Sequence, residues 1–335
     1  MVSGTGSALI PGAPTGRPTR APLQGLATPT PLVELTALDT GRCRLFAKLE
    51  LQNPTGSIKD RVATAMIRAA EAEGRLRPGM TIVEGSSGNA TIALGAVARR
   101  RGYKVLAYLP ASITEEKLRL HRALGVGYER FSPDPAQPFR NVRRDEALAR
   151  AANDPKTFCC LDQFSNAANV RAHEATTGRE IVEQSPTTID RYFAGAGTGG
   201  SLVGIGRALL AKNPATRVTL VDPEGSTLAA HFRRDDPSRR QQAASDGIGE
   251  RFVPGNLEMD LVHDAVTVSR ERALRHCVDL ARATGIVAGP CTGYSLAAAL
   301  DWCQTQPQPR AALILVCDRG ENYFSDPDYA AAFGL

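Results

Sequence analysis

The 335-residue chain lacks the sequence features that mark membrane, secreted and metal-binding proteins. No apolar run approaches the length that spans a membrane, and the N-terminus has no basic segment followed by a hydrophobic one. The five histidines are scattered, and the seven cysteines form neither an even set nor a metal-spaced pair. We therefore expect a cytoplasmic protein with reduced thiols and no metal site.

Excess charge of one sign is also missing, because the formal net charge is only +5. The arginines are interspersed with acids, as in residues 143–146, unlike the basic surface of a nucleic-acid-binding protein. With 42% hydrophobic residues, the chain can bury the core of two domains or of one large α/β unit. We expect a globular homodimer that acts on small molecules, with no nucleic-acid or membrane partner.

Lysine is scarce, because the chain takes its positive charge mainly from arginine. One of its few lysines, Lys59, lies in the segment Asn53-Pro54-Thr55-Gly56-Ser57-Ile58-Lys59-Asp60-Arg61, directly before the helical pattern of residues 62–67. An amine at a helix start can do Schiff-base chemistry, which arginine cannot. A solvated lysine at a helix start is the simpler interpretation when Lys59 is taken alone.

A second segment, Glu84-Gly85-Ser86-Ser87-Gly88-Asn89-Ala90-Thr91, stands between an apolar run and a helical stretch. A strand-to-helix turn of small residues leaves backbone N–H groups open at a helix N-terminus, which suits a carboxylate. Asn89 can add a hydrogen bond to a phenolic oxygen of a cofactor ring. Alone, the segment is more typical of a polar N-cap.

A third segment, Gly195-Ala196-Gly197-Thr198-Gly199-Gly200-Ser201, precedes the helical pattern of residues 202–212. Its glycines allow close backbone approach, so successive N–H groups can surround a phosphate. The same letters match a dinucleotide-binding fingerprint, with Asp222 ending the next apolar run. A nicotinamide-dependent dehydrogenase therefore remains an alternative at this point.

Apolar runs alternate with helical patterns along most of the chain, which predicts parallel sheet covered by helices. The predicted strands lie at 45–49, 81–83, 104–109, near Tyr192, and at 218–221 and 312–316. The predicted helices lie at 59–73, 90–101, 114–124 and 202–212. Residues 1–27 are rich in Gly, Pro, Ala, Ser and Thr, which indicates a flexible N-terminal tail.

Together, the three segments resemble the cysteine synthase and cystathionine β-synthase family, a group of fold type II pyridoxal phosphate enzymes. The resemblance covers about residues 28–325 and includes two more signatures, at 162–181 and 247–254. It implies an α/β fold of two domains, each a mostly parallel twisted sheet covered by helices, with the cofactor in the cleft between them. The smaller, mobile domain would span 51–165, and the larger would comprise 28–50 and 166–325, followed by a C-terminal end at 326–335.

The resemblance also implies roles for individual residues. Lys59 would hold pyridoxal 5'-phosphate as an aldimine and then act as the base that removes the α-proton. The cofactor would contact Asn89 through its phenolic oxygen, and its phosphate would lie on Gly197, Thr198, Gly199, Gly200 and Ser201. The substrate carboxylate would be received by Ser86, Ser87, Gly88, Asn89 and Gln163.

Three departures from the family pattern bear on the reaction. Cys291 occupies the position of a serine that faces the pyridine nitrogen, and Thr292 is an alternative for that role. Ala90 replaces a threonine that usually contacts the substrate. Residues 317–324 look more like N-(2-amino-2-carboxyethyl)-glutamate synthases of diaminopropionate pathways.

The resemblance thus implies β-replacement on an activated L-serine, O-acetylserine or O-phosphoserine, through an aminoacrylate intermediate. An amine-accepting aminocarboxyethyl-glutamate synthase, a serine or threonine dehydratase and a non-catalytic binding protein are the alternatives. Arg143 would bind the phosphate of O-phosphoserine, together with its neighbours Arg140 and Arg144, because guanidinium groups match phosphate geometry. A solvated helix face with arginines on its outer side is the simpler interpretation of these three residues.

Overall fold

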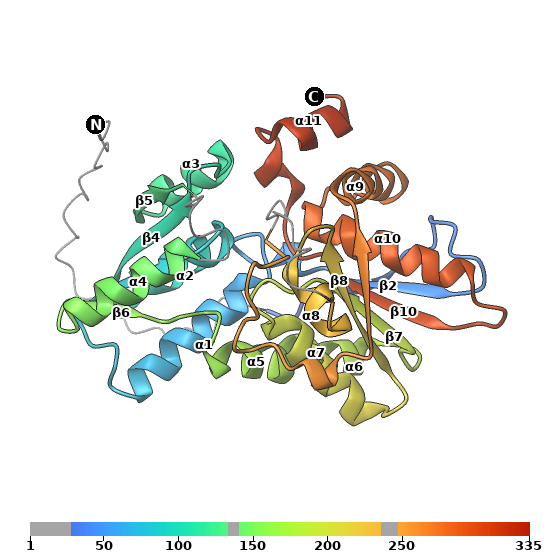
Figure 1. Ribbon diagram of the computed structural model, residues 1–335, viewed down its shortest axis with the longest axis horizontal. Coiled ribbons are helices and arrows are strands. Elements are labelled where there is room, and N and C mark those ends of the chain that lie inside the picture. Colours follow the sequence, from blue (N-terminus) through green and yellow to red (C-terminus); the bar gives the residue numbers. More distant parts are fainter. Residues whose placement is uncertain (1–27, 133–140, 236–246) are drawn as a thin grey trace.

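Two separate β-sheets form the framework of the computed structural model, which describes residues 28–132, 141–235 and 247–335. The predicted tail at 1–27 and Arg140 lie outside the described residues. The larger sheet has six strands in the order β1-β2-β10-β7-β8-β9, and the smaller has four in the order β5-β4-β3-β6 (Figure 1). Every neighbouring pair is parallel except β1 and β2, which are antiparallel.

The strands of the larger sheet come from both ends of the described chain: β1 Leu32–Glu34, β2 Arg44–Lys48, β7 Arg191–Ala194, β8 Arg217–Pro223, β9 Asp264–Val268 and β10 Ala311–Leu315. The smaller sheet is continuous in sequence: β3 Thr81–Gly85, β4 Lys104–Pro110, β5 Gly127–Phe131 and β6 Phe158–Cys160. All four of these strands fall inside the range 51–165. The exact domain boundaries and the mobility of the smaller domain remain predictions.

Helices cover both faces of each sheet, as the parallel strand order requires. Around the smaller sheet lie α1 Lys59–Ala72, α2 Asn89–Arg100, α3 Glu115–Ala123 and α4 Val142–Asn153 (Figure 1). The rest of the described chain supplies α5 Ala167–His173, α6 Arg179–Gln184, α7 Gly200–Lys212, α8 Thr227–Arg233, α9 Arg270–Thr284, α10 Pro290–Gln304 and α11 Pro327–Phe333. A short π-helical segment at Glu174–Gly178 joins α5 to α6, and 3-10 turns occupy Glu50–Gln52, Met259–Leu261 and Gly320–Tyr323.

Each sheet has its own apolar core. One face of the larger sheet packs on α9 and α10 through residues such as Phe193 and Leu296, and its other face packs on α7 and α8 through Leu202 and Leu228. Under the smaller sheet, Met66 of α1 and Leu94 of α2 meet buried strand residues. The predicted α/β fold with two mostly parallel sheets is confirmed. No helix of the described segments has the length and apolar character needed to cross a membrane.

Candidate active site

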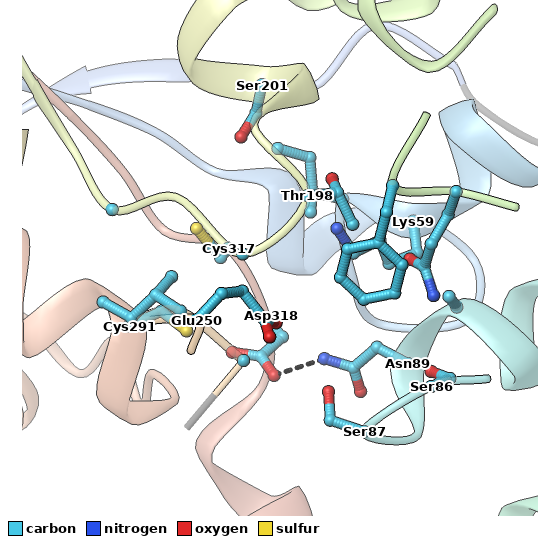
Figure 2. Close-up of a pocket in the computed structure, with 18 of the residues that line it drawn as sticks. Lys59, Ser86, Ser87, Asn89, Thr198, Ser201, Glu250, Cys291, Cys317 and Asp318 are labelled. Atoms are coloured by element: carbon cyan, nitrogen blue, oxygen red, sulfur yellow. Dashed lines mark hydrogen bonds between the residues drawn. The ribbon is translucent and has the colours of Figure 1, made fainter. Parts of the chain in front are cut away.

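A single pocket brings together residues from both sheets, at the ends of strands and the beginnings of helices (Figure 2). The empty space between its walls, with the open mouth included, is about 810 Å³. The residues predicted from sequence that line it are Lys59, Ser86, Ser87, Asn89, Arg143, Gln163, Gly197, Thr198, Ser201 and Cys291. The remaining three do not line the pocket: Gly88 and Gly199 are the N-caps of α2 and α7, and Gly200 is the first residue of α7.

Four helices begin at this pocket. Lys59 is the first residue of α1, Asn89 the first of α2, Ser201 the second of α7 and Cys291 the second of α10. None of the four has a side-chain hydrogen bond at its N-cap, whereas α4, α5, α8, α9 and α11 are all capped by Asn, Ser or Asp side chains. The positive ends of four helix dipoles therefore meet at one cavity, and such a cavity attracts anions.

Lys59 carries the amine in this pocket, and its pKa is lowered. Burial disfavours the charged ammonium, and the opposing pull of Cys317, Cys291 and Asp318 does not fully offset it. The N-terminal dipole of α1 acts in the same direction as burial. A larger fraction of the Lys59 amine is therefore neutral, and so nucleophilic, than for a solvent-exposed lysine.

A buried cluster of charges fixes the start of α1. Arg61, two residues after Lys59, binds Glu50 through Nε at 2.7 Å and Glu180 through Nη1 at 2.6 Å. Lys48 binds the same Glu180 at 2.8 Å. Although burial alone would raise it, the pKa of Glu180 is lowered by hydrogen bonds from Arg61 and Lys48. Because Glu50 and Glu180 flank the larger sheet, these bonds hold the first turn of α1 against it.

The turn between β3 and α2 is held from both sides. Gly88 has a φ of +131°, which favours glycine, and its N–H donates to Ser86 Oγ at 2.9 Å. Asn89 Nδ2 donates to Asp318 Oδ2 at 2.6 Å, so that one of its two N–H groups faces the segment after β10 (Figure 2). Tyr323 donates to the same oxygen at 2.6 Å. Burial raises the pKa of Asp318.

Glu84 lies beneath this turn and connects two strands of the smaller sheet. Its carboxylate accepts from the backbone N–H groups of Asp162 at 3.0 Å and Gln163 at 3.1 Å. Burial raises the pKa of Glu84 to about 8 despite these two bonds. The side chain of Gln163 in turn donates from Nε2 to the Gly85 carbonyl at 2.9 Å. Gln163 is therefore at the pocket wall, with part of its donor capacity used by the turn.

The arginines at the start of α4 have separate environments. Arg143 lines the pocket and donates from Nη1 to the Ser86 carbonyl at 2.9 Å, and burial lowers its pKa. Arg144 instead forms a bidentate pair with Asp162, at 2.7 and 2.8 Å. The Arg144 guanidinium also lies over the rings of Phe164 and Phe252, which contact each other. The hypothesis that Arg144 assists in phosphate binding is not favoured by this arrangement, because its side chain already serves a structural pair.

The glycine-rich loop of residues 195–201 is packed so closely that side chains are excluded. A Cβ atom on Gly197 would lie 2.3 Å from the Gly247 carbonyl oxygen, and one on Gly200 would lie 2.1 Å from Asn169 Oδ1. Asn169 is buried and donates from Nδ2 to Thr198 Oγ1 at 2.9 Å. The loop is thus held in one conformation, with the N–H groups of the first turn of α7 open toward the pocket.

Cys291 and Thr292 differ in what their side chains face. Cys291 lines the pocket near the start of α10 and is 8% exposed. Thr292 is fully buried, and its hydroxyl accepts from the Cys317 N–H at 3.3 Å. Of the two residues proposed to face the cofactor nitrogen, only Cys291 is therefore available to the cavity.

Sequence reasoning did not assign a role to two acidic residues of the pocket, Glu250 and Asp318. Both lie in segments that resemble the family, but neither is part of a glycine loop or a lysine motif. Glu250 could have been found from its position, because it directly follows Gly247-Ile248-Gly249, the loop that packs on Gly197. Burial raises the pKa of Glu250 to about 7.

Comparison with known proteins decides the family. The family model for pyridoxal-phosphate dependent enzymes matches residues 23–318. The chain belongs to this family. Cysteine synthase of Staphylococcus aureus is 33% identical over 303 residues, which cover 90% of this chain and 94% of that protein. Cysteine synthase A of Escherichia coli is 34% identical over 308 residues, covering 91% and 94% of the two chains.

Solved structures of the family are similar throughout the fold. The crystal structure of O-ureido-L-serine synthase has a TM-score of 0.79 at 32% identity and covers 90% of this chain and 92% of that chain. A hydrogen sulfide-producing enzyme of Fusobacterium nucleatum has a TM-score of 0.80 at 30% identity, with 89% and 97% covered. The protein is therefore a pyridoxal phosphate-dependent enzyme of the β-substituting type, and the dinucleotide interpretation of the glycine loop is not supported.

The residues present fit this cofactor. An amine of lowered pKa lies at Lys59, and the glycine loop at the start of α7 offers N–H groups for a phosphate. Asn89 retains a second N–H beside the one bound to Asp318. None of these residue roles requires a metal ion.

Proposed function

We propose that this enzyme catalyses β-replacement on an L-serine that is activated at its β-oxygen, O-acetylserine or O-phosphoserine. The observation that carries the proposal is the meeting of four uncapped helix N-termini around the Lys59 amine. Cysteine and O-ureido-L-serine, the products named by the relatives, are both alanines that carry a heteroatom on the β-carbon. Their synthases therefore support this class of reaction for the chain.

Pyridoxal phosphate, when bound, supplies an electron sink that makes the α-carbon of an attached amino acid acidic. Lys59 Nζ would hold the cofactor, and its lowered pKa suits an amine that must accept the α-proton near neutral pH. The N–H groups of Thr198, Gly199, Gly200 and Ser201 would bind the phosphate. Asn89 would bond the phenolic oxygen through its second N–H, and Cys291 would face the ring nitrogen.

The donor carboxylate would lie at the N-terminus of α2. Ser86, Ser87, Gly88 and Asn89 present N–H and hydroxyl groups there, and Gln163 stands at the pocket wall behind the turn. Ala90 also lines the pocket and offers no hydroxyl, so this carboxylate has one polar contact fewer than in the usual family pattern. We propose that closure of the smaller sheet over the bound donor excludes water from the reacting carbon.

A direct test is to incubate the holoenzyme with each donor and with sulfide, homocysteine or glutamate in turn, and to identify every product by mass. A β-substituted alanine supports the proposal. Glutamate incorporation would identify an aminocarboxyethyl-glutamate synthase, and pyruvate formed from unactivated serine would identify a dehydratase. A donor that survives in every mixture would refute β-replacement altogether.

A further inference from the structure

Asp318 is a buried acid of the pocket wall whose side chain binds a residue from the other sheet. It lines the pocket and is only 1% exposed. Its Oδ2 accepts from Asn89 Nδ2 at 2.6 Å, the dashed line in Figure 2, and from the Tyr323 hydroxyl at 2.6 Å. Asn89 begins α2, which follows a strand of the smaller sheet, whereas Asp318 follows β10 of the larger sheet. The contact therefore joins the two halves of the site.

Main-chain bonds fix Asp318 between two other helix starts. The N–H of Ile58, the residue before Lys59, donates to the Cys317 carbonyl at 2.9 Å. The N–H of Gly289, the N-cap of α10, donates to the Asp318 carbonyl at 3.0 Å. A Cβ atom on Gly289 would collide with Asp318 Oδ1, so glycine at this position leaves room for the carboxylate. The Asp318 side chain thus projects from a backbone that is bonded to the starts of both α1 and α10.

The same segment also contacts the smaller sheet's helices further along. Thr114 Oγ1, at the N-cap of α3, donates to the Asn322 carbonyl at 2.7 Å. The Glu115 N–H donates to Ser325 Oγ at 3.0 Å. The segment that carries Asp318 therefore meets the starts of both α2 and α3, and the place of its carboxylate does not depend on the Asn89 bond alone.

The bond to Asp318 fixes which way the Asn89 amide points. A carboxylate only accepts hydrogen bonds, so it holds the NH2 end of the amide and disfavours the flipped arrangement, in which oxygen would face oxygen. The second N–H then diverges from the first in the plane of the amide. Without Asp318, the last torsion of the Asn89 side chain is free to turn, since torsions of this kind are broad and roughly two-fold.

We propose that Asp318 is the positioning residue for Asn89, and that it keeps the second N–H of the amide directed at the phenolic oxygen of the cofactor. This inference rests on the proposed contact between Asn89 and that oxygen, and it adds the residue that orients the contact. A hydrogen bond donated to the ionised oxygen stabilises the ionised form. Through Asn89, Asp318 thus raises the affinity for the cofactor and favours ionisation of its phenolic oxygen.

Two substitutions separate the hydrogen bond from the charge of Asp318. Asp318→Asn keeps an oxygen that can accept from Asn89 and Tyr323, and its NH2 group takes the place of Oδ1, which has no hydrogen-bond partner among the described residues. Asp318→Leu fills a similar space with no acceptor. The charge itself opposes the proposed effect, because a negative group disfavours a second ionised oxygen nearby. An effect of charge alone would therefore be the same in both variants.

The test is a titration of each apoprotein with pyridoxal phosphate at one pH, followed by visible absorbance, with unfolding in urea measured in parallel. Asp318→Leu should raise the Kd at least about tenfold, the loss expected for one hydrogen bond to a charged group, and should weaken the absorption band of the ionised form. Asp318→Asn should stay within about threefold of the wild type. Glu321→Ala, at an exposed acid of the same segment outside the pocket, should match the wild type.

A double-mutant cycle with Asn89→Ala decides whether Asp318 acts through Asn89. Once the amide is gone, Asp318→Leu should add less than about a twofold further loss. A full tenfold loss in the Asn89→Ala background would overturn the inference, and so would equal losses in Asp318→Asn and Asp318→Leu. An Asn89→Ala protein that binds the cofactor as the wild type does would overturn it as well.

The inference stays testable if Asp318→Leu does not fold. Asp318→Asn is closest to the native shape, and a loss as large as that of Asn89→Ala would then overturn the inference by itself. All of these results leave β-replacement intact, because cofactor binding is measured without a donor. The proposed function fails instead if no nucleophile is joined to the β-carbon of either donor.

Discussion

Replacing Gly199 with alanine should strip the enzyme of its cofactor without unfolding it. Gly199 is the N-cap of α7 and has a φ of +81°, a conformation that L side chains rarely adopt. An added Cβ atom would lie 2.9 Å from the backbone nitrogen of Leu257. That nitrogen is bonded to the Pro254 carbonyl at 3.0 Å and cannot move freely.

The expected cost can be worked out from these two effects. A left-handed backbone costs a non-glycine residue about 1–2 kcal/mol. The contact with Leu257 adds a displacement of one of the two segments, for which we take about 1–2 kcal/mol more. We expect the loop of the variant to leave this conformation when no cofactor is bound, so that the cost is paid when the cofactor phosphate requires the native conformation. A total of about 2–4 kcal/mol raises the Kd for pyridoxal phosphate by roughly 30-fold to 1000-fold.

The assay is a titration of apoprotein with pyridoxal phosphate, followed by the visible absorbance of the bound cofactor. The matched control is Gly102→Ala, since Gly102 has a φ of +83° but no atom within 4 Å of the added Cβ. It pays the same backbone strain far from the pocket and should bind the cofactor as the wild type does. Equal affinities for Gly199→Ala and Gly102→Ala would refute the role of the 195–201 loop as the phosphate site.

Three other perturbations test the surroundings of the site. Arg61→Met should lower the free energy of unfolding, measured in urea, by about 3–5 kcal/mol, because it leaves the fully buried Glu50 without its ion-pair partner and leaves Glu180, 9% exposed, with Lys48 alone. Arg44→Met, at an exposed pair with Glu34, should change little, and similar losses would contradict the argument. Cys291→Ser should keep the cofactor and give comparable or faster β-elimination, since a hydroxyl is the better hydrogen-bond donor, whereas unchanged spectra in both Cys291→Ser and Cys291→Asp would mean that the side chain points elsewhere. Burial raises the pKa of Glu250 to about 7 against Arg143, Arg251 and Lys59, with Asp222 acting in the same direction as burial, so Glu250 becomes an anion as the pH rises through that value. Because Glu250 lines the pocket, the pH profile of wild-type kcat/KM should contain a step near pH 7 that Glu250→Gln lacks, and identical profiles would contradict this.

Much of the fold could be predicted from periodicity. The helix expected at 59–73 is α1, Lys59–Ala72, and the strand expected at 104–109 lies within β4, Lys104–Pro110. Short or half-exposed strands such as β6 and β9 could not be predicted, because three to five residues with mixed burial show no clear alternation of apolar and polar side chains. The sheet order also could not be deduced, since β2 pairs with β10 across more than two hundred and fifty residues of sequence.

The site was predictable where backbone geometry demands a particular residue. The glycine turns and Lys59 are visible in the sequence because few other residues serve a helix N-terminus that must approach a ligand. Glu250 and Asp318 were not predicted, because a single acid has no pattern until the fold places it beside a cavity. Arg144 was assigned a role in binding that the structure does not favour. Its sequence context is the same as that of Arg143, and only the structure reveals its bond to Asp162.

The central claim is that Lys59 carries the cofactor in a β-replacement reaction. Borohydride reduction of the holoenzyme, followed by proteolysis and mass spectrometry, tests it most directly. The account predicts that the reduced pyridoxyl group is found on Lys59, and that Lys59→Ala shows no label and no turnover of O-acetylserine. A label on Lys48 or Lys117 instead, or turnover that survives in Lys59→Ala, would contradict it.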